Sequence, residues 1–292
     1  MRLRTLGAGN RGFPWKTALC CSQEHKHVDL GEKLQIRRVT SASLVRACRR
    51  YLAQDPVSNV LPLGDLYPPL FQVSDVYCAA ERKRVVGVCA IYRAFSKPSL
   101  VLGAAVQEVK EALVKKAIGE ISDEFISLCP PNEVDLYKDY SSVLRHHREQ
   151  QMIANPPKQI ECRGIRVEKI RENELELLSE FYEPRTEAWV PIQFRAGPYY
   201  CVKRDGKIVS AAGVHLVTPQ IAQLGNIITD EPCRNQGFAT ACINALVADL
   251  ASKGRIISLF VRANNGPAIH VYKKLGFQKA RDISFLVMRK NK

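Results

Sequence analysis

A ten-residue turn in the last third of the chain has residue types suited to binding an anion. It reads Glu231-Pro232-Cys233-Arg234-Asn235-Gln236-Gly237-Phe238-Ala239-Thr240. Apolar residues then recur at helical spacing, at Ala239, Ile243, Leu246, Val247 and Leu250. A helix N-terminus presents unpaired N–H groups and the positive end of the helix dipole, while glycine lets the backbone approach a ligand. The turn therefore predicts an anion cradle, although an ordinary strand-to-helix turn can look alike.

A second segment follows a predicted buried strand over residues 255–261. It reads Asn264-Asn265-Gly266-Pro267-Ala268-Ile269-His270-Val271-Tyr272-Lys273-Lys274-Leu275-Gly276-Phe277. Asn265 is suited to cap a helix, Pro267 falls in the first turn of that helix, and Gly276 ends it. The helix carries Tyr272, whose hydroxyl could donate a proton or whose ring could simply pack in the core.

Together the two segments resemble the GNAT superfamily of acyl-CoA-dependent N-acyltransferases. Residues 234–239 are similar to its pyrophosphate loop, Gln/Arg-x-x-Gly-x-Gly/Ala. Asn265-x-x-Ala268-x-x-x-Tyr272-x-x-x-Gly276-Phe277 is similar to its second signature, at the expected distance. The resemblance covers about residues 197–290 and, in topology, extends back to residue 161. The runs 211–215 and 224–227 look similar to the glycine N-acyltransferase-like branch.

The resemblance implies an enzyme that moves an acyl group, expected to be acetyl, from acetyl-CoA to a primary amine by direct attack. It implies no metal. The residues expected to bind acetyl-CoA are backbone groups beside its pantetheine arm, the loop at its pyrophosphate, and two residues of the second signature: Ile227, Ile228, Thr229, Arg234, Asn235, Gln236, Gly237, Phe238, Ala239, Thr240, Asn265 and Ala268.

Two proton transfers accompany this reaction, and the resemblance assigns Tyr272 as the general acid. Family members often carry a glutamate base on the strand before the loop, where this chain has Gln223, and an amide cannot take a proton. A three-residue hairpin loop at 218–220 would pair Val217 with Ile221 and place His215 opposite Gln223. His215 is therefore the predicted base, with an ordinary strand histidine as the alternative. His270 would point away from Tyr272.

The elements needed to position these residues occur twice. The first series is expected as strand 34–39, helix 41–52, strands 76–80, 85–92 and 99–102, helix 106–118 and strand 125–128. The second is strand 165–167, helix 172–181 and strands 199–203, 208–217 and 221–229, before the anion-cradle helix. We predict an α+β protein of two tandem GNAT-like mixed-sheet halves, with only the C-terminal one complete, because Gly103-Ala104-Ala105 lacks the loop spacing.

This repeat predicts three regions: a poorly ordered extension over 1–33, a diverged N-terminal domain over 34–160 and a catalytic domain over 161–292. The polar residues 145–158, with Asn155-Pro156-Pro157, have the composition of a linker. In the extension, the G-x-G-x-x-G of residues 7–12 lacks flanking elements for a dinucleotide site. Cys20, Cys21, His25 and His27 form only a weak zinc pattern, and a presequence or misassigned start is an alternative.

Charge and cysteine usage limit the classes of ligand, partner and cellular location to be expected. The net charge is +14, and residues 188–292 carry 15 basic against 5 acidic side chains, which suits an anionic ligand. The longest apolar runs fall short of the ~20 residues of a membrane-spanning helix. Ten cysteines without regular spacing favour reduced thiols and a cytoplasmic location. The expected partner is an amine-bearing small molecule or peptide, with the oligomeric state open; a non-catalytic acyl-CoA-binding regulatory module and, with less support, nucleic-acid binding are the alternatives.

Overall fold

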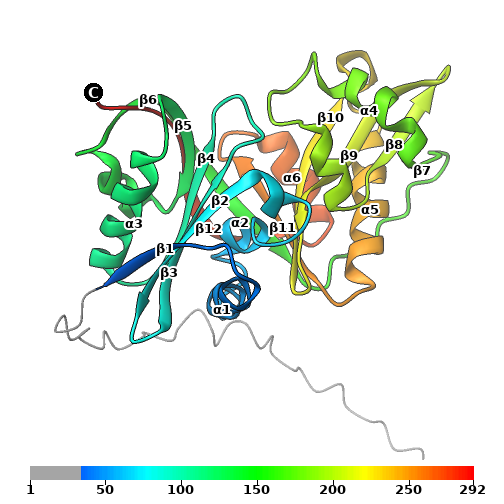
Figure 1. The fold of residues 1–292 in the computed structure, drawn as a ribbon. Coiled ribbons are helices and arrows are strands. Elements are labelled where there is room, and N and C mark those ends of the chain that lie inside the picture. Colours follow the sequence, from blue (N-terminus) through cyan, green and yellow to red (C-terminus); the bar gives the residue numbers. More distant parts are fainter. Residues whose placement is uncertain (1–33) are drawn as a thin grey trace, which may run out of the picture. The chain divides into compact units, whose positions relative to one another are not determined.

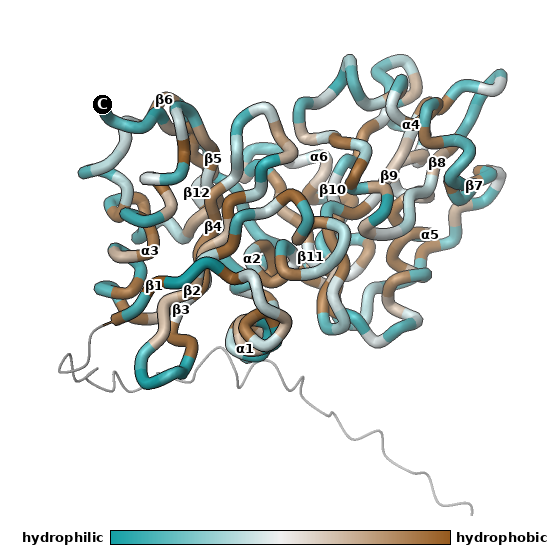
Figure 2. Tube along the Cα trace, in the orientation of Figure 1, coloured by the Kyte–Doolittle hydropathy of each residue, from teal (hydrophilic) through white to brown (hydrophobic). Residues whose placement is uncertain are grey.

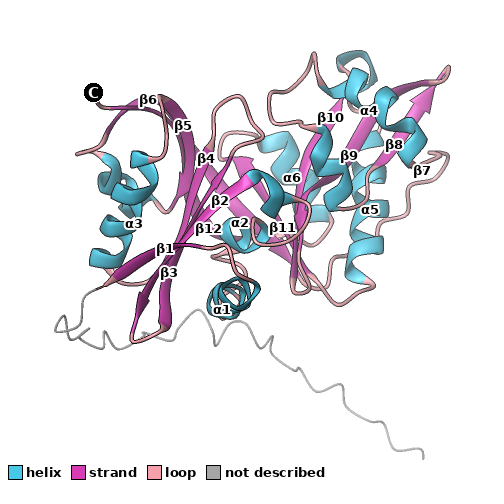
Figure 3. Ribbon diagram, in the orientation of Figure 1, coloured by secondary structure: helices cyan, strands magenta, loops and turns pink. Residues whose placement is uncertain are grey.

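The computed structural model describes residues 34–292, which form one compact unit. The features predicted for residues 1–33 lie outside the described residues. All twelve strands of the described part belong to one mixed sheet, in the order β1-β2-β3-β4-β5-β12-β6-β11-β10-β9-β8-β7 (Figure 1). Helices flank this sheet (Figure 3).

The first series of elements follows the predicted order. It consists of β1 (Gln35–Arg38), α1 (Ala42–Leu52), α2 (Val60–Gly64), β2 (Ser74–Glu81), β3 (Arg84–Tyr92), β4 (Ser99–Ala104), α3 (Gln107–Gly119), β5 (Glu124–Cys129) and β6 (Ser141–Ala154). Ser41 caps α1 by accepting a hydrogen bond from the Leu44 N–H, and Arg49 and Arg50 lie in its last turn, where they suit the helix dipole.

The second series repeats this order. It consists of β7 (Glu168–Lys169), α4 (Leu175–Tyr182), β8 (Tyr200–Arg204), β9 (Lys207–Val217), β10 (Ile221–Thr229), α5 (Phe238–Ala251), β11 (Ile256–Arg262), α6 (Gly266–Lys274) and β12 (Gln278–Lys290). The position of α2 is taken here by a short 3-10 helix, Pro191–Ala196.

The two series exchange their last strands. β6, the last strand of the first series, pairs with β11 of the second, from Ile257↔Ala154 to Arg262↔Glu149. β12 ends the second series and pairs with β5 of the first, from Ser284↔Cys129 to Arg289↔Glu124. β6 and β12 also pair with each other at the centre of the sheet. The domain boundary predicted between residues 160 and 161 stays a prediction. Strands from each side of this boundary pair with strands from the other side.

Alternating strand residues fill separate apolar clusters on the two faces of the sheet. In β2, Cys78 packs toward α1 and α2, whereas Tyr77 packs toward α3. The cluster under α1 and α2 also includes Leu216 of β9 and Ile221 of β10, so the two halves share a core. Hydrophobic residues accordingly run along the strands in both halves (Figure 2).

Two local predictions were wrong. The stretch predicted as linker, 145–158, is mostly β6, because a strand with neighbours on both edges can carry polar side chains where its faces reach solvent. The strand predicted at 165–167 lies at Glu168–Lys169 instead. α2 and β12 were not predicted.

The exchange generates a stability prediction. Leu286 of β12 is fully buried in the cluster around α3, so Leu286→Ala should lower the free energy of unfolding by about 2–5 kcal/mol. Unfolding is followed by circular dichroism and by Trp189 fluorescence in a Trp15→Phe background, and both curves should shift together because β12 joins the halves. Leu144→Ala, at a side chain 47% exposed, is the control. A shift confined to one probe would show that the halves unfold independently.

Candidate active site

Two parallel strands separate in the C-terminal half and open a cleft. β10 and β11 pair only from Ile221↔Ile256 to Leu224↔Leu259, and the remainder of β10 pairs with β9 alone. The β9–β10 pairing is itself irregular between Gly225 and Ile228, where Asn226 adopts a left-handed conformation with φ of 52°. Backbone groups of β10 beyond Leu224 therefore face an open space instead of a neighbouring strand.

The loop after β10 has the conformation that an anion cradle needs. Asn235 and Gly237 have φ of 61° and 80°, in the left-handed region that asparagine tolerates and glycine favours. Gly237 is the N-cap of α5, and its carbonyl accepts the first helical hydrogen bond, from the Ala241 N–H, at 3.0 Å. The N–H groups of residues 238–240 have no acceptor within residues 34–292, so they are free to bind a ligand.

Between the separated strands, this loop and α6 lies a cleft of about 850 Å³. It brings together ten of the fourteen predicted site residues: Ile227, Ile228, Thr229, Arg234, Asn235, Phe238, Ala239, Asn265, Ala268 and Tyr272. The other four, Gln236, Gly237, Thr240 and His215, do not line it.

The charged residues at the mouth of the cleft are partly engaged within the protein. The Arg234 guanidinium is 58% exposed and pairs with Glu231 at 3.1 Å. The Gln236 side chain donates to the Pro232 carbonyl and accepts from Arg204, so it is turned away from the cleft. Arg185 lines the cleft, pairs with Asp230 at 2.7 Å and was not predicted, because it lies about fifty residues before the motif on a segment without a recognisable signature.

Tyr272 lies on the wall formed by α6. Its side chain is 7% exposed, and its ring lies 5.9 Å from that of Phe277. Burial raises the pKa of Tyr272 to about 12, so the phenol is protonated at neutral pH. Its hydroxyl has no hydrogen-bond partner among the described residues, which leaves it able to donate to a group in the cleft.

His215 does not line the cleft, and its predicted register was wrong. The hairpin is one residue tighter than predicted: Leu216 pairs with Gln223 and Val217 with Ala222, and His215 is the extra residue of a bulge. Its ring therefore covers Gly225 instead of facing Gln223; a Cβ at residue 225 would lie 2.1 Å from its Nε2.

The surroundings of His215 keep its imidazole neutral. The side chain is half-buried, and its Nε2 lies 3.4 Å from Oδ1 of Asn226. Burial lowers the pKa of His215, and the Asn226 contact opposes this only in part. A neutral imidazole can accept a proton at physiological pH.

A buried polar network holds the β10 bulge in place. Asn226 donates to Gln193 Oε1 at 2.9 Å and to the Tyr199 hydroxyl at 3.3 Å, and its carbonyl accepts from Tyr182 at 2.5 Å. The Tyr199 ring covers Gly213, which pairs with Gly225. The glycine pair thus leaves room for two rings, and these glycines were the available signal for a network that sequence reasoning missed.

The equivalent opening in the N-terminal half is nearly filled. β4 and β5 are also parallel and pair only at Ser99↔Ile126 and Leu100↔Ser127, but the space beyond them is about 130 Å³. Leu52 and Asn59 occupy the position where a Cβ on Gly103 would lie. No residue between Gly103 and α3 has a positive φ, so this half lacks the anion-binding turn.

Neither metal ligation nor membrane crossing has support in the described part of the chain. Residues 34–292 hold no group of three His, Cys, Asp or Glu side chains placed to ligate a metal ion. None of the helices in this range is both long and apolar enough to cross a membrane.

Comparisons with known proteins agree with this geometry. Residues 168–277 match the model of the acetyltransferase (GNAT) family. An uncharacterized N-acetyltransferase of Methanocaldococcus jannaschii is 36% identical over 61 residues. That match covers 20% of this chain and 27% of the relative, so the chain matches little more than a quarter of that protein's length.

Solved structures share the fold across both halves. A GNAT-family protein of Novosphingobium aromaticivorans has a TM-score of 0.55 at 23% identity, covering 70% of this chain and 89% of that one. A tandem GNAT protein from the clavulanic acid biosynthesis pathway has a TM-score of 0.57 at 13% identity, covering 88% of this chain and 98% of that one. A Drosophila protein has a TM-score of 0.66 at 10% identity, covering 89% of this chain and 99% of that one.

The predicted fold class, two tandem GNAT-like halves, is confirmed, whereas the glycine N-acyltransferase-like branch stays a prediction. The left-handed turn at α5, the separated strands and the family match all fall within the same residues. Residues 168–277 of this chain therefore match an acetyltransferase domain of the GNAT family.

Proposed function

We propose that residues 161–292 transfer an acetyl group from acetyl-CoA to a primary amine by direct attack. One observation carries the proposal: a single cleft of about 850 Å³ joins the free N–H groups of α5, the unpaired edge of β10 and the Tyr272 hydroxyl. Residues 34–160 then serve as a non-catalytic partner, and one acetyl-CoA binds per chain. The free thiols of the described cysteines support a reducing, cytoplasmic setting.

The residues present fit acetyl-CoA. The N–H groups at the start of α5, with Arg234 beside them, suit a pyrophosphate. Ile227, Ile228 and Thr229 present backbone groups at the open edge of β10, which suits the amide-bearing pantetheine arm. Asn265 and Ala268 form the facing wall on α6.

Bound acetyl-CoA supplies a thioester carbonyl that a neutral amine can attack. The protein then has to remove one proton from the attacking nitrogen and deliver one to the departing sulfur. Tyr272 holds its proton at neutral pH and faces the cleft, so it suits the donor role. His215 is neutral and lies against Gly225 and Asn226 of β10, so it suits the acceptor role.

Gln223 supports the placement of the amine. Its side chain is 1% exposed, and its Oε1 has no hydrogen-bond partner among the described residues. A buried amide oxygen without a donor costs free energy, and an amine or a water molecule next to β10 would supply that donor. Gln223 can thus accept a hydrogen bond from the amine without removing its proton.

Calorimetry with acetyl-CoA, followed by thiol release over a panel of amines, tests the proposal. The expected result is one saturable site per chain and amine-dependent thiol release. Two sites per chain would give the N-terminal half a role that its 130 Å³ cavity does not suggest. Binding without release from any amine would favour a regulatory acyl-CoA-binding module.

Gly237→Asp should abolish acetyl-CoA binding, because it places a carboxylate at the start of α5. The φ of 80° adds backbone strain of about 1–2 kcal/mol. Gly254→Asp is the matched control: Gly254 has a φ of 71° at the far end of α5, with no atom within 4 Å of an added Cβ. Calorimetry should detect binding in Gly254→Asp only. Equal affinity in both folded variants would contradict the assignment of residues 234–240.

Tyr272→Phe should lower kcat about 10- to 1,000-fold while acetyl-CoA affinity holds, since only the proton donor is lost. Steady-state thiol release and calorimetry measure the two quantities. Tyr200→Phe, which loses a hydroxyl bonded to Asp249 outside the cleft, should keep the parent kcat. A parent-like kcat in Tyr272→Phe would remove the tyrosine from the proton path.

His215→Ala should remove one component from the acidic limb of the kcat/KM pH profile. The base must be neutral, and burial lowers the pKa of His215, so the parent should lose activity as pH falls below the ordinary histidine value of about 6.5. In the variant, only the acceptor amine should shape that limb. His270→Ala, on the exposed face of α6, is the control. Identical profiles for all three proteins would exclude His215 as the base.

A further inference from the structure

A carboxyl group without a partner lies buried where the two halves meet. Asp65 ends α2 and is 6% exposed, and no residue of the described chain forms a hydrogen bond or ion pair with its side chain. Burial raises the pKa of Asp65 to about 8. An unpaired buried acid costs stability, and such costs are typical of binding sites.

The fold places Asp65 over the strands of the active site. The neighbouring Gly64 lies directly against Leu216 of β9; a Cβ there would be 2.3–2.8 Å from the Leu216 side chain. Leu216 pairs with Gln223 of β10 and follows His215 along β9. Asp65 thus belongs to the N-terminal half but follows a residue that packs on β9, at the Leu216 that pairs with the unpartnered Gln223.

An unpartnered hydroxyl, that of Tyr92, lies near this carboxyl. The Tyr92 hydroxyl has no hydrogen-bond partner among described residues, although burial and the nearby Asp65 charge both raise the pKa of Tyr92. Asp65 and Tyr92 therefore interact electrostatically but share no hydrogen bond, so both can bind a third group. Trp189, whose ring lies 5.3 Å from that of Tyr199, also has a buried N–H without an acceptor.

The loop that carries Trp189 makes few backbone contacts with the sheet. Between α4 and the 3-10 helix Pro191–Ala196, its backbone hydrogen bonds in the described chain are local, such as Thr186 N–H to Tyr182 and Gln193 N–H to Val190. Such a segment can shift without breaking the sheet.

Resting on the proposed function, we propose that Asp65 binds the acetyl acceptor, and that this acceptor is a cationic amine without a carboxylate beside its nitrogen. An ammonium group offers three N–H donors to a carboxylate, and the rings of the nearby Tyr92 and of Tyr199 next to it suit a cation. A carboxylate on the acceptor would find no cation at Asp65 to offset the cost of burying its charge. Asp65 thus selects and positions the acceptor, while His215 takes its proton.

The titratable groups near Asp65 do not neutralise the charge that it carries when ionised. Arg49 of α1 donates to the Leu66 carbonyl and stacks 3.9 Å from the Tyr67 ring centre, so its charge is directed elsewhere. Tyr92 of β3 and Tyr199, which precedes β8, are held protonated by burial, and His215 of β9 is neutral.

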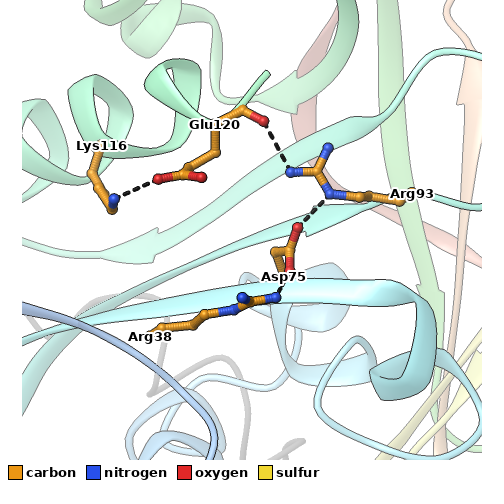
Figure 4. Close-up of polar contacts among 5 residues, drawn as sticks. All are labelled: Arg38, Asp75, Arg93, Lys116 and Glu120. Atoms are coloured by element: carbon orange, nitrogen blue, oxygen red, sulfur yellow. Dashed lines mark hydrogen bonds and ion pairs between the residues drawn. The ribbon is translucent and has the colours of Figure 1, made fainter. Parts of the chain in front are cut away.

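Asp75 provides the contrast in the same half (Figure 4). It pairs with Arg38 and Arg93, and Arg93 also donates to the Glu120 carbonyl at 3.0 Å. Burial would raise the pKa of Asp75, but these two arginines outweigh burial and lower it. Asp75 therefore stabilises the fold, and Asp65 does not.

Replacing each aspartate by asparagine separates a binding role from a structural one. Asp65→Asn should raise Tm, increasingly from pH 4 to pH 8, because over this range Asp65 of the parent ionises in the unfolded chain but stays protonated in the folded one. The same variant should raise the acceptor KM at least 10-fold with an unchanged acetyl-CoA KM. Asp75→Asn should lower Tm and leave both KM values unchanged. A lower Tm and an unchanged acceptor KM in Asp65→Asn would make Asp65 structural and overturn the proposal.

Acceptor pairs with and without a carboxylate beside the amine test the substrate class. Thiol release is compared for glycinamide against glycine and for 2-phenylethylamine against phenylalanine. The parent should favour the amine without the carboxylate at least 10-fold in each pair, and Asp65→Asn should reduce that preference. If the parent prefers the amino acids, or if both proteins show an equal preference, the proposed acceptor class is overturned.

A binding measurement keeps this test separate from the proposed activity. 2-Phenylethylamine should raise the Tm of the parent and not that of Asp65→Asn. If the parent binds acetyl-CoA and shows this shift but turns over none of the amines, the proposed activity fails and the Asp65 site stands. If 2-phenylethylamine does not shift the parent, the Asp65 site fails whatever the enzyme acetylates.

Discussion

The reciprocal exchange of β6 and β12 is the constraint on which the rest of this structure depends. Each half begins its sheet with its own strands and completes it with the last strand of the other. The parallel pairs β4–β5 and β10–β11 can then separate at one end, because β5 and β11 each keep an antiparallel neighbour on the other edge. The opening that forms the cleft therefore does not leave its strands without partners.

The same topology yields a site in one half and nearly none in the other, and the difference lies in a few backbone conformations. Asn235 and Gly237 turn the chain into α5 with left-handed residues, and the cleft beyond is about 850 Å³. In the N-terminal half, the chain enters α3 without such residues, and side chains from α1 and the following segment fill the space. That half instead contributes α2, which packs against β9.

Local patterns predicted most of the elements and the loop, because each depends on residues close in sequence. Apolar alternation marked β2 to β5 and β8 to β10, and the glycine of the turn marked the start of α5. Pairing between distant segments was not predictable in this way. β6 carries a polar sequence and is a strand only because β11 and β12 lie on its two edges.

For the site as well, residues in contiguous motifs were predictable and those that depend on distant segments were not. The cleft residues of the loop and of α6 were predicted, since both motifs are contiguous. The position of His215 was not, because a single extra residue in β9 changes which side chains face each other across the hairpin. Arg185, Asn226 and Asp65 were missed for a related reason: their roles depend on segments that the fold brings together from up to about 160 positions apart.

The distribution of charged groups separates what stabilises the protein from what the site requires. Asp75 and Glu120 have their counter-ions within the N-terminal half: the two arginines beside Asp75 outweigh its desolvation, and Glu120 pairs with Lys116. Tyr92 and Gln223 keep buried polar atoms without partners, and the buried Asp65 has no counter-ion among the described residues. Because each such group opposes folding, a ligand that completes them explains their presence better than packing does. Under the proposed function, the N-terminal half would contribute a wall to the acceptor site, although its own opening is nearly filled.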